Sequence, residues 1–381
     1  MTRLLYLSAD PGVPVLGHKG ASVHVRELAQ ALADAGVDVH IATPRVAPEG
    51  EVLRPELELH VIPPVPLKGH AVTAVQRAVR AQVEAVTALA AGLEVDAIYE
   101  RFSLFSPAGV RAAGALELPH ALEVNAPLRE EARRYRTLPH PELARAFEAE
   151  VMTRTDRVLA VSEALAGTLA RDGVAREKIE VLPNGVASHR FRPPRRDPSR
   201  FVVGFAGSLK PWHGVDTMVA AVARVPEVHL EVLGHGPGAE LLDLLPPERV
   251  TRLGARPHSS VAAAMAGWDV GLAPYAPVDG FWFSPLKVLE YMAAGACPVV
   301  SDLGDAATTL GGGERGVLVP AADIDGLASA ICALARDRGR AQLLGERARA
   351  WVRTHRSWSA NAERVLGALG LRAAAPTREA A

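Results

Sequence analysis

The chain has 381 residues, of which 49% are hydrophobic and 22% charged, a composition typical of a folded protein of two domains rather than of a disordered chain. Its 42 Lys and Arg nearly balance its 43 Asp and Glu, so the net charge indicates neither nucleic acid nor an anionic membrane as a partner. The two cysteines, Cys297 and Cys332, cannot form a disulfide framework and lack the spacing of metal ligands.

The N-terminal half alternates short apolar runs with amphipathic segments, the pattern of a parallel α/β sheet. The first apolar run, 4–8, is too short for a signal peptide or a membrane span, so we expect a cytoplasmic protein without a transmembrane segment. The helix that follows has one apolar face and ends at Gly36. Further strands are predicted at 39–43, 57–62, 97–101, 122–125 and 157–161.

A segment rich in proline and charge, 191–198, separates this series of strands from a second one. Because proline disfavours regular hydrogen-bonded structure, we interpret the segment as a linker; a long surface loop inside one domain is the alternative. The second series is predicted at 201–206, 230–233, 270–274, 298–301 and 316–319, before a largely helical region that ends near residue 371. The predicted organisation is therefore a domain 1–190, a domain 191–355 and a C-terminal helix with a frayed tail, 356–381.

The stretch 283–295 contains the most informative pattern, a loop followed by a helix that ends at Gly295. Ser284 and Lys287 then lie at a helix N-terminus, where backbone N–H groups and the helix dipole attract anions. Glu290 follows one turn later on the same face. A lysine for phosphate and a carboxylate for the ribose hydroxyls are what a nucleoside diphosphate requires; an ordinary surface Lys–Glu pair is the alternative.

This stretch resembles the C-terminal signature of glycosyltransferase family 4, the retaining, sugar-nucleotide-dependent enzymes with the GT-B fold. Other segments are similar to further motifs of that family, in the same order: 20–24 (GASVH), 161–163 (VSE) with 183–186 (PNGV), 207–214 (GSLKPWHG) and 233–237 (LGHGP). The resemblance implies two Rossmann-like parallel α/β domains that face a central cleft. The N-terminal domain would bind the acceptor, the C-terminal domain would bind the donor, and the last helix would cross back to the N-terminal domain.

The resemblance also implies a site for a nucleotide-sugar donor, with a UDP-sugar as our first expectation, a GDP-sugar as the second, and adenosine still open. Lys287 and Lys210 would neutralise the negative charge of the departing diphosphate, and Glu290 would bind the ribose hydroxyls. The other donor contacts that we expect are Gly20, Ala21, Gly207, Ser208, Gly234, Arg256, Ser284 and Leu289. A solvated loop lysine is the alternative for Lys210, and a flexible surface loop is the alternative for 17–22.

The chain departs from the family pattern at three positions. Family members usually carry an arginine after the first glycine of the 207–214 loop and a lysine before its last glycine, where this chain has Ser208 and His213. We expect His213 to cap or pack rather than to ionise. The earlier of two family glutamates is replaced by Trp282, so Asp279, three residues before it, is a candidate contact for the sugar or the acceptor.

Polar residues at the ends of two N-terminal strands are the candidates for the acceptor side. Ligands of open parallel sheets bind beyond the carboxyl ends of the strands, where we expect Arg101, Glu123 and Asn125. His24, in the first turn of the first helix, either faces the same region or packs beneath it. A purely structural ion pair is the alternative for these groups.

The activity that the resemblance implies is retaining transfer by front-face displacement, without a metal or another cofactor, in glycan or glycoconjugate biosynthesis. A nicotinamide enzyme is disfavoured because no G-x-G-x-x-G fingerprint follows a strand, and no G-x-S-x-G motif indicates a hydrolase. A non-hydrolysing UDP-sugar epimerase of the same fold and a non-catalytic nucleotide-sugar-binding subunit remain alternatives.

The acceptor stays open among glycans, lipid-linked sugars and small molecules. The arginines within 129–136 could bind an anionic membrane surface from one side. The two glutamates among them favour a solvated helix face instead.

Overall fold

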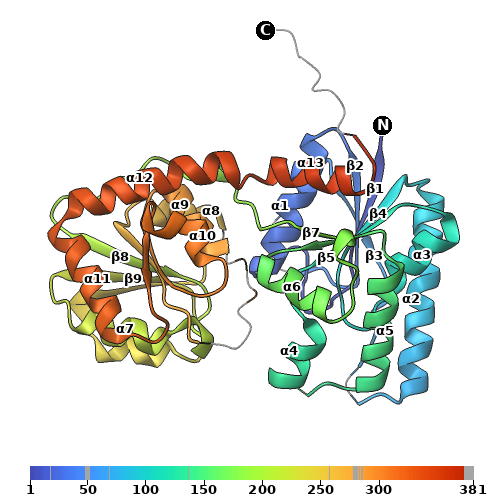
Figure 1. The fold of residues 1–381 in the computed structure, drawn as a ribbon, viewed down its shortest axis with the longest axis horizontal. Coiled ribbons are helices and arrows are strands. Elements are labelled where there is room, and N and C mark those ends of the chain that lie inside the picture. The colour runs from blue at the N-terminus through green and yellow to red at the C-terminus, as the bar shows by residue number, and fades with distance from the viewer. Residues whose placement is uncertain are drawn as a thin grey trace, which may run out of the picture. The chain divides into compact units, whose positions relative to one another are not determined.

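The computed structural model describes residues 1–17, 19–47, 52–67, 69–135, 137–256, 258–277, 282, 284 and 286–372. The chain forms two compact units (Figure 1), one made of Met1–Asn184 with Trp358–Ala381 and the other of Gly185–Ser357. The boundaries expected from the sequence, 190/191 and 355/356, lie a few residues from these divisions. Among the described residues, none of the helices combines the length and the hydrophobicity that crossing a bilayer requires.

The first unit is built on a seven-stranded parallel sheet with the strand order β3-β2-β1-β4-β5-β6-β7. Its strands are β1 (Arg3–Ser8), β2 (Asp38–Thr43), β3 (Glu58–Val61), β4 (Ala97–Arg101), β5 (His120–Val124), β6 (Arg157–Ala160) and β7 (Ile179–Val181). The strand β7 was not predicted from the sequence, because three residues are too few to show a period.

Helices cover the faces of this sheet (Figure 1), and this is why its central strands are apolar without alternation. In β1, four consecutive side chains from Leu4 to Leu7 are fully buried. The helices of the unit are α1 (Gly20–Asp34), α2 (Val72–Gly92), α3 (Ala108–Leu116), α4 (Leu128–Tyr135), α5 (Pro141–Arg154), α6 (Glu163–Arg171) and α13 (Trp358–Ala368). The helix α13 packs against α1, so the last described helix belongs to the first unit, as the sequence analysis expected.

The second unit contains a six-stranded parallel sheet with the order β10-β9-β8-β11-β12-β13. Its strands are β8 (Phe201–Ala206), β9 (Val228–Leu233), β10 (Val250–Gly254), β11 (Val270–Ala273), β12 (Cys297–Ser301) and β13 (Val317–Val319). Its helices are α7 (Val215–Ala223), α8 (His258–Met265), α9 (Leu286–Ala294), α10 (Ala306–Leu310), α11 (Ile324–Arg336) and α12 (Arg338–His355). The expected pair of Rossmann-like parallel α/β sheets is confirmed.

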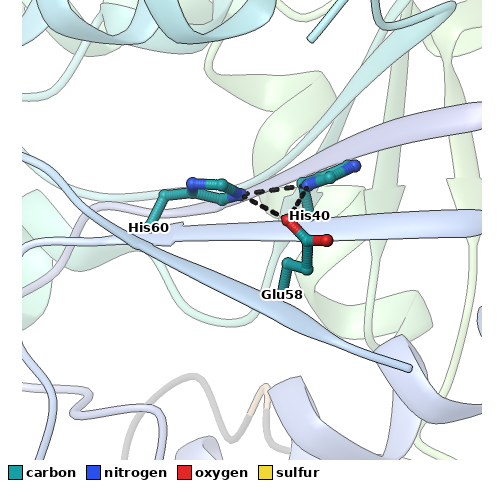
Figure 2. A group of neighbouring side chains, drawn as sticks. All are labelled: His40, Glu58 and His60. Atoms are coloured by element: carbon teal, nitrogen blue, oxygen red, sulfur yellow. Dashed lines mark hydrogen bonds and ion pairs between the residues drawn. The ribbon is translucent and has the colours of Figure 1, made fainter. Parts of the chain in front are cut away.

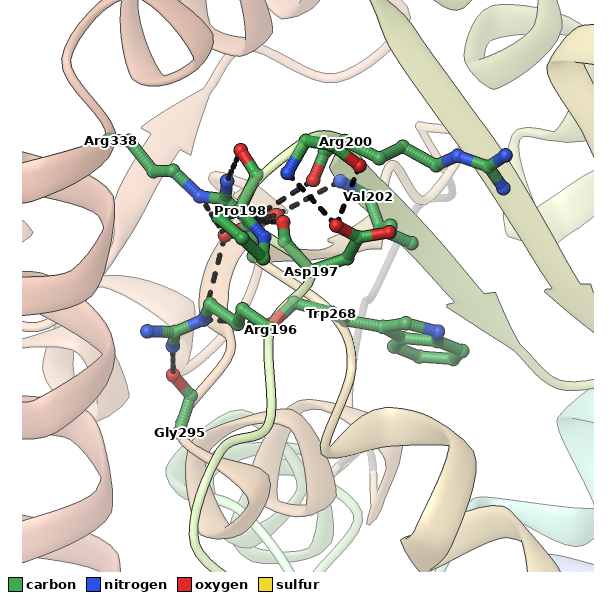
Figure 3. A network of polar contacts seen from close by, with 10 residues as sticks. Arg196, Asp197, Pro198, Arg200, Val202, Trp268, Gly295 and Arg338 are labelled. Atoms are coloured by element: carbon green, nitrogen blue, oxygen red, sulfur yellow. Dashed lines mark hydrogen bonds and ion pairs between the residues drawn. The ribbon is translucent and has the colours of Figure 1, made fainter.

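The proline-rich segment interpreted as a linker is fixed to the second unit by arginines (Figure 3). The guanidinium of Arg338 donates to two backbone oxygens of the segment, those of Asp197 at 2.6 Å and Pro198 at 3.0 Å, and to that of Arg200, just after it, at 3.0 Å. Its Nε also donates to the buried Asp269 at 2.9 Å. Hydrogen bonds from Arg338, on α12, therefore anchor the segment, and the division between the units falls before it, at 184/185.

Candidate functional site

Both sheets have a point at which the strand order reverses, between β1 and β4 in the first unit and between β8 and β11 in the second. Ligands of open α/β sheets bind beyond the carboxyl ends of the strands at such points. Of the predicted acceptor-side residues, Arg101 is the last residue of β4 and Glu123 is the last but one of β5. The predicted donor residues Gly207 and Gly234 directly follow β8 and β9.

Lys287 has the most unusual environment of the donor candidates. It lies in the first turn of α9, and its Nζ is buried without a hydrogen-bond partner among the described residues. The Nζ atom lies 4.3 Å from the centre of the Phe205 ring and 5.2 Å from that of Tyr275. Burial lowers the pKa of Lys287 to about 7, although Glu290 partly opposes this effect. An amine in this environment gains most from an anion that binds beside it.

Two glycines keep the space beside this amine open. A Cβ atom on Gly207 would lie 2.8 Å from the Nζ of Lys287, and a Cβ on Gly234 would lie 1.9 Å from the carbonyl oxygen of Gly207. Both residues also have positive φ angles, +138° and +133°, which side chains disfavour. The loops after β8 and β9 can therefore pack together, and their backbone can approach a phosphate closely, only because both positions are glycine.

Ser208 and His213, which replace the usual cations of the family, bond to each other. The Nδ1–H of His213 donates to the Ser208 carbonyl, and Nδ1 lies 3.5 Å from Ser208 Oγ. Burial, followed by the charge of Lys287, lowers the pKa of His213 to about 4, so its imidazole is neutral at pH 7 and packs rather than ionises, as expected. Positive charge in this loop is left to Lys210, whose exposed Nζ lies 4.7 Å from the centre of the Trp212 ring.

The remaining donor candidates are distributed over both units. Ser284 and Glu290 are half-buried in the second unit, whereas Leu289 packs in its apolar core. The exposed Arg256 donates from Nε to the Leu253 carbonyl at 2.8 Å, beyond the end of β10. Gly20 and Ala21 form the start of α1 in the first unit. Asp279 lies outside the described residues, while Trp282, at the position of the missing glutamate, is buried.

In the first unit, Glu123 is the centre of a buried polar cluster. Its carboxylate accepts hydrogen bonds from the Tyr99 hydroxyl at 2.7 Å, from Arg101 Nη1 at 2.6 Å, and from the Asn125 amide. The Nε2 of His24 lies 2.9 Å from it. Burial alone would raise the pKa of Glu123, but the charges of His24 and Arg101 and the hydrogen bonds outweigh it, so this pKa lies well below its usual range. The carboxylate is therefore ionised and positions its neighbours rather than abstracting a proton.

The other side of His24 connects this cluster to the 183–186 segment and to α13. The Nδ1 of His24 lies 2.7 Å from Asn184 Oδ1, and the Trp358 ring packs edge-on against the imidazole with 4.8 Å between ring centres. The Asn361 amide donates to the Pro183 carbonyl at 2.8 Å. The first turns of α13 thus cover the cluster and hold the segment that supplies Asn184.

Four acceptor-side candidates lie together in the structure: His24, Arg101 and Asn125 each contact the carboxylate of the fourth, Glu123. Sequence reasoning missed Tyr99 and Asn184 as members of this cluster. Tyr99 precedes Glu100 on β4, and neighbours on a strand point to opposite faces, so Glu100 instead meets His120 Nε2 at 3.1 Å. The similarity of 183–186 to a family motif drew attention to Asn184, but no pattern in the sequence indicates that it bonds to His24.

Two protein-family models match the chain. Residues 18–190 match the family model described as Glycosyltransferase Family 4, and residues 200–337 match that of Glycosyl transferases group 1. The chain is 27% identical to a D-inositol 3-phosphate glycosyltransferase of Kribbella flavida over 89% of this chain and 87% of the relative.

Solved structures share the fold. A sucrose-phosphate synthase of Thermosynechococcus elongatus matches with a TM-score of 0.75 at 22% identity, over 96% of this chain and 97% of the other. The Anabaena protein Alr3699/HepE, solved with UDP-glucose, matches with a TM-score of 0.73 at 18% identity, over 97% of this chain and all of the other.

Proposed function

Because the chain belongs to glycosyltransferase family 4, has the GT-B fold and is an enzyme that transfers sugars, we propose that it moves a hexosyl or related sugar from a UDP-sugar to a hydroxyl acceptor with retention of configuration. The observation that carries this proposal is the buried Nζ of Lys287 beside Gly207, which has no hydrogen-bond partner in the part of the chain that the structure describes. A donor diphosphate would supply the anion that this amine lacks. Glu290, one turn further along α9, would bind the ribose hydroxyls.

Lys287 would act on the leaving group. With a pKa of about 7, about half of these amines carry a proton at pH 7 before the donor binds, and the diphosphate would draw the remainder into the charged form. Negative charge on the diphosphate grows as the glycosidic bond breaks, so an ammonium beside it stabilises the transition state more than the bound donor. The exposed Lys210 would add a second positive charge from the neighbouring loop.

The acceptor hydroxyl would attack from the face that the diphosphate leaves, and the departing phosphate would take its proton. In this mechanism the protein has to position the substrates and supply positive charge, and a general base is not required. The ionised, fully bonded Glu123 fits that requirement, since its role would be to hold Arg101 and His24 in place. No metal or other cofactor is part of the proposal.

Two features support the choice of substrates for the first assays. The Anabaena protein of similar fold was solved with UDP-glucose, which supports UDP-sugars before GDP-sugars as donors. The relative from Kribbella flavida is named for D-inositol 3-phosphate, so polyol phosphates are the first small-molecule acceptors to try. Glycan and lipid-linked acceptors follow.

A thermal-shift panel with UDP, GDP, ADP and NAD tests the donor site directly. A ligand that binds only the folded state at a hundredfold its Kd stabilises it by about 2.7 kcal/mol, which is a clear rise in melting temperature. We expect the largest rise with UDP; a rise with NAD alone would refute the proposal. Transfer is then measured by mass spectrometry with the matching nucleotide sugar, with and without acceptor. Conversion of the sugar without any acceptor would indicate an epimerase instead.

A further inference from the structure

A second cluster of polar side chains lies at the edge of the first sheet, away from the strand ends described above. His40 is on β2, and Glu58 and His60 are on the neighbouring edge strand β3 (Figure 2). In the parallel register, His40 pairs with Glu58 and Ala42 pairs with His60. Side chains two residues apart on a strand share a face, so all three groups project from the same side of the sheet. Figure 2 shows them pointing toward one another.

The three potential ligand atoms form a compact triangle. His40 Nδ1 lies 3.0 Å from His60 Nε2 and 3.3 Å from Glu58 Oε2, and His60 Nε2 lies 3.8 Å from the same oxygen. The point equidistant from these atoms in their plane is about 2.0 Å from each, which matches the usual zinc–nitrogen and zinc–oxygen distances of about 2.0 to 2.2 Å. An ion placed just above that plane would have three ligands on one face of a tetrahedron and an open fourth position.

Neighbouring side chains orient one of the three potential metal ligands, His40. His40 is buried, and its second nitrogen, Nε2, lies 3.3 Å from Asp38 Oδ1. Asp38 is in turn held by Arg3, whose Nε donates to its other oxygen at 2.8 Å. Although this contact is not a hydrogen bond, a carboxylate so close to Nε2 favours the proton there, which leaves the near nitrogen, Nδ1, available to a metal.

We propose that His40, Glu58 and His60 form a binding site for a divalent transition metal of the zinc class. Two imidazoles and one carboxylate are ligands that suit zinc and its first-row neighbours, whereas magnesium prefers a shell of oxygens. The glutamate side chain is 63% exposed and His60 is 24% exposed, so an ion can reach the site from solvent. Bound metal would cross-link the four-residue edge strand β3 to β2 through side chains, in addition to their backbone pairing.

The alternative is that the two imidazoles only share a hydrogen bond. Titration of untagged, metal-stripped protein with Zn²⁺ by calorimetry distinguishes the two. We expect one strong site per chain, and a loss of affinity of at least about a hundredfold in the His60→Gln/Glu58→Gln variant. Asp38→Asn should weaken binding by about 10- to 100-fold, since it removes only the orienting partner. The exposed His189→Gln is the matched control and should bind as the wild type does.

Spectroscopy and stability give independent readouts that do not involve sugar transfer. Co²⁺ should develop the visible absorption of a tetrahedral site in the wild type, excess Mg²⁺ should not displace it, and Zn²⁺ should raise the melting temperature of the wild type only. If the double variant does not fold, Glu58→Gln alone, at an exposed side chain, replaces it. Equal zinc affinity in the wild type, the site variants and His189→Gln would overturn the proposal.

Discussion

Replacement of Lys287 by methionine tests the candidate active site most directly. Methionine keeps most of the apolar stem of the lysine but removes the amine, whose Nζ lies over the rings of Phe205 and Tyr275. Two unit charges about 4 Å apart interact by about 4 kcal/mol at an effective dielectric constant of about 20. If between half and all of this interaction develops in the transition state, Lys287→Met lowers kcat by about 30- to 1,000-fold. The exposed Lys210→Met should lower it less.

Although Lys287→Met should lower kcat, it should not lower the stability of the folded protein. The pKa of Lys287 is about 7 in the folded protein and near 10.5 in the unfolded chain. Between these values the unfolded state binds more protons, so this lysine makes the folded protein less stable at pH 7 than at pH 10. Lys287→Met should therefore be at least as stable as the wild type at pH 7 and should lack the stabilisation that the wild type gains as the pH rises from 7 to 10.

Two assays measure these effects. Steady-state kinetics with the nucleotide sugar identified in the thermal-shift panel gives kcat, and thermal unfolding from pH 6 to pH 10 gives the stability difference. UDP affinity should also fall above pH 7 in the wild type, because the amine must then take up a proton on binding. A variant with kcat within threefold of the wild type, or one that is clearly less stable at pH 7, would refute the assignment.

Two further substitutions test the surrounding structure. Glu123→Gln should destabilise the folded protein by about 3–5 kcal/mol at pH 7, because Arg101 loses its buried anion. The pKa of Glu123 is depressed in the folded state, so its stabilisation is present above the unfolded value of 4.5 and fades as the pH falls below it. Urea unfolding at pH 7 and pH 3 checks this, and an equal deficit at both would contradict it. Gly234→Ala should abolish the melting-temperature rise with UDP, because its Cβ would overlap the Gly207 carbonyl. Gly92→Ala, where a Cβ meets no atom within 4 Å, is its control and should keep that rise.

Most of the fold was predictable because buried parallel strands are short, continuous apolar runs, as from Leu4 to Leu7. The three-residue β7 was not, because nothing in its length or pattern separates it from a loop. The segment 191–198 was correctly seen as irregular, but its attachment depends on Arg338, more than a hundred residues later. Sequence proximity carries no information about such a contact.

The candidate site shows the same limit. The helix start at Lys287 could be predicted from local rules, whereas the burial of its amine depends on Phe205 from a separate strand. Glu123 was found through its place at a strand end, but its partner Tyr99, and Asn184, which bonds to His24 on the other side of that imidazole, come from other parts of the chain. The cluster of His40, Glu58 and His60 requires the register between β2 and β3, and composition cannot supply that register.

The assignment of α13 to the first unit has a consequence for biosynthesis. Trp358 packs on His24, and Asn361 bonds to Pro183, so the N-terminal unit is complete only after residues encoded beyond the whole second unit have been made. The second unit, Gly185–Ser357, is continuous in sequence and needs no later residue. On the ribosome, the unit that is synthesised first is therefore the one that finishes folding last. Until α13 leaves the exit tunnel, the polar cluster around Glu123 lacks its aromatic cover.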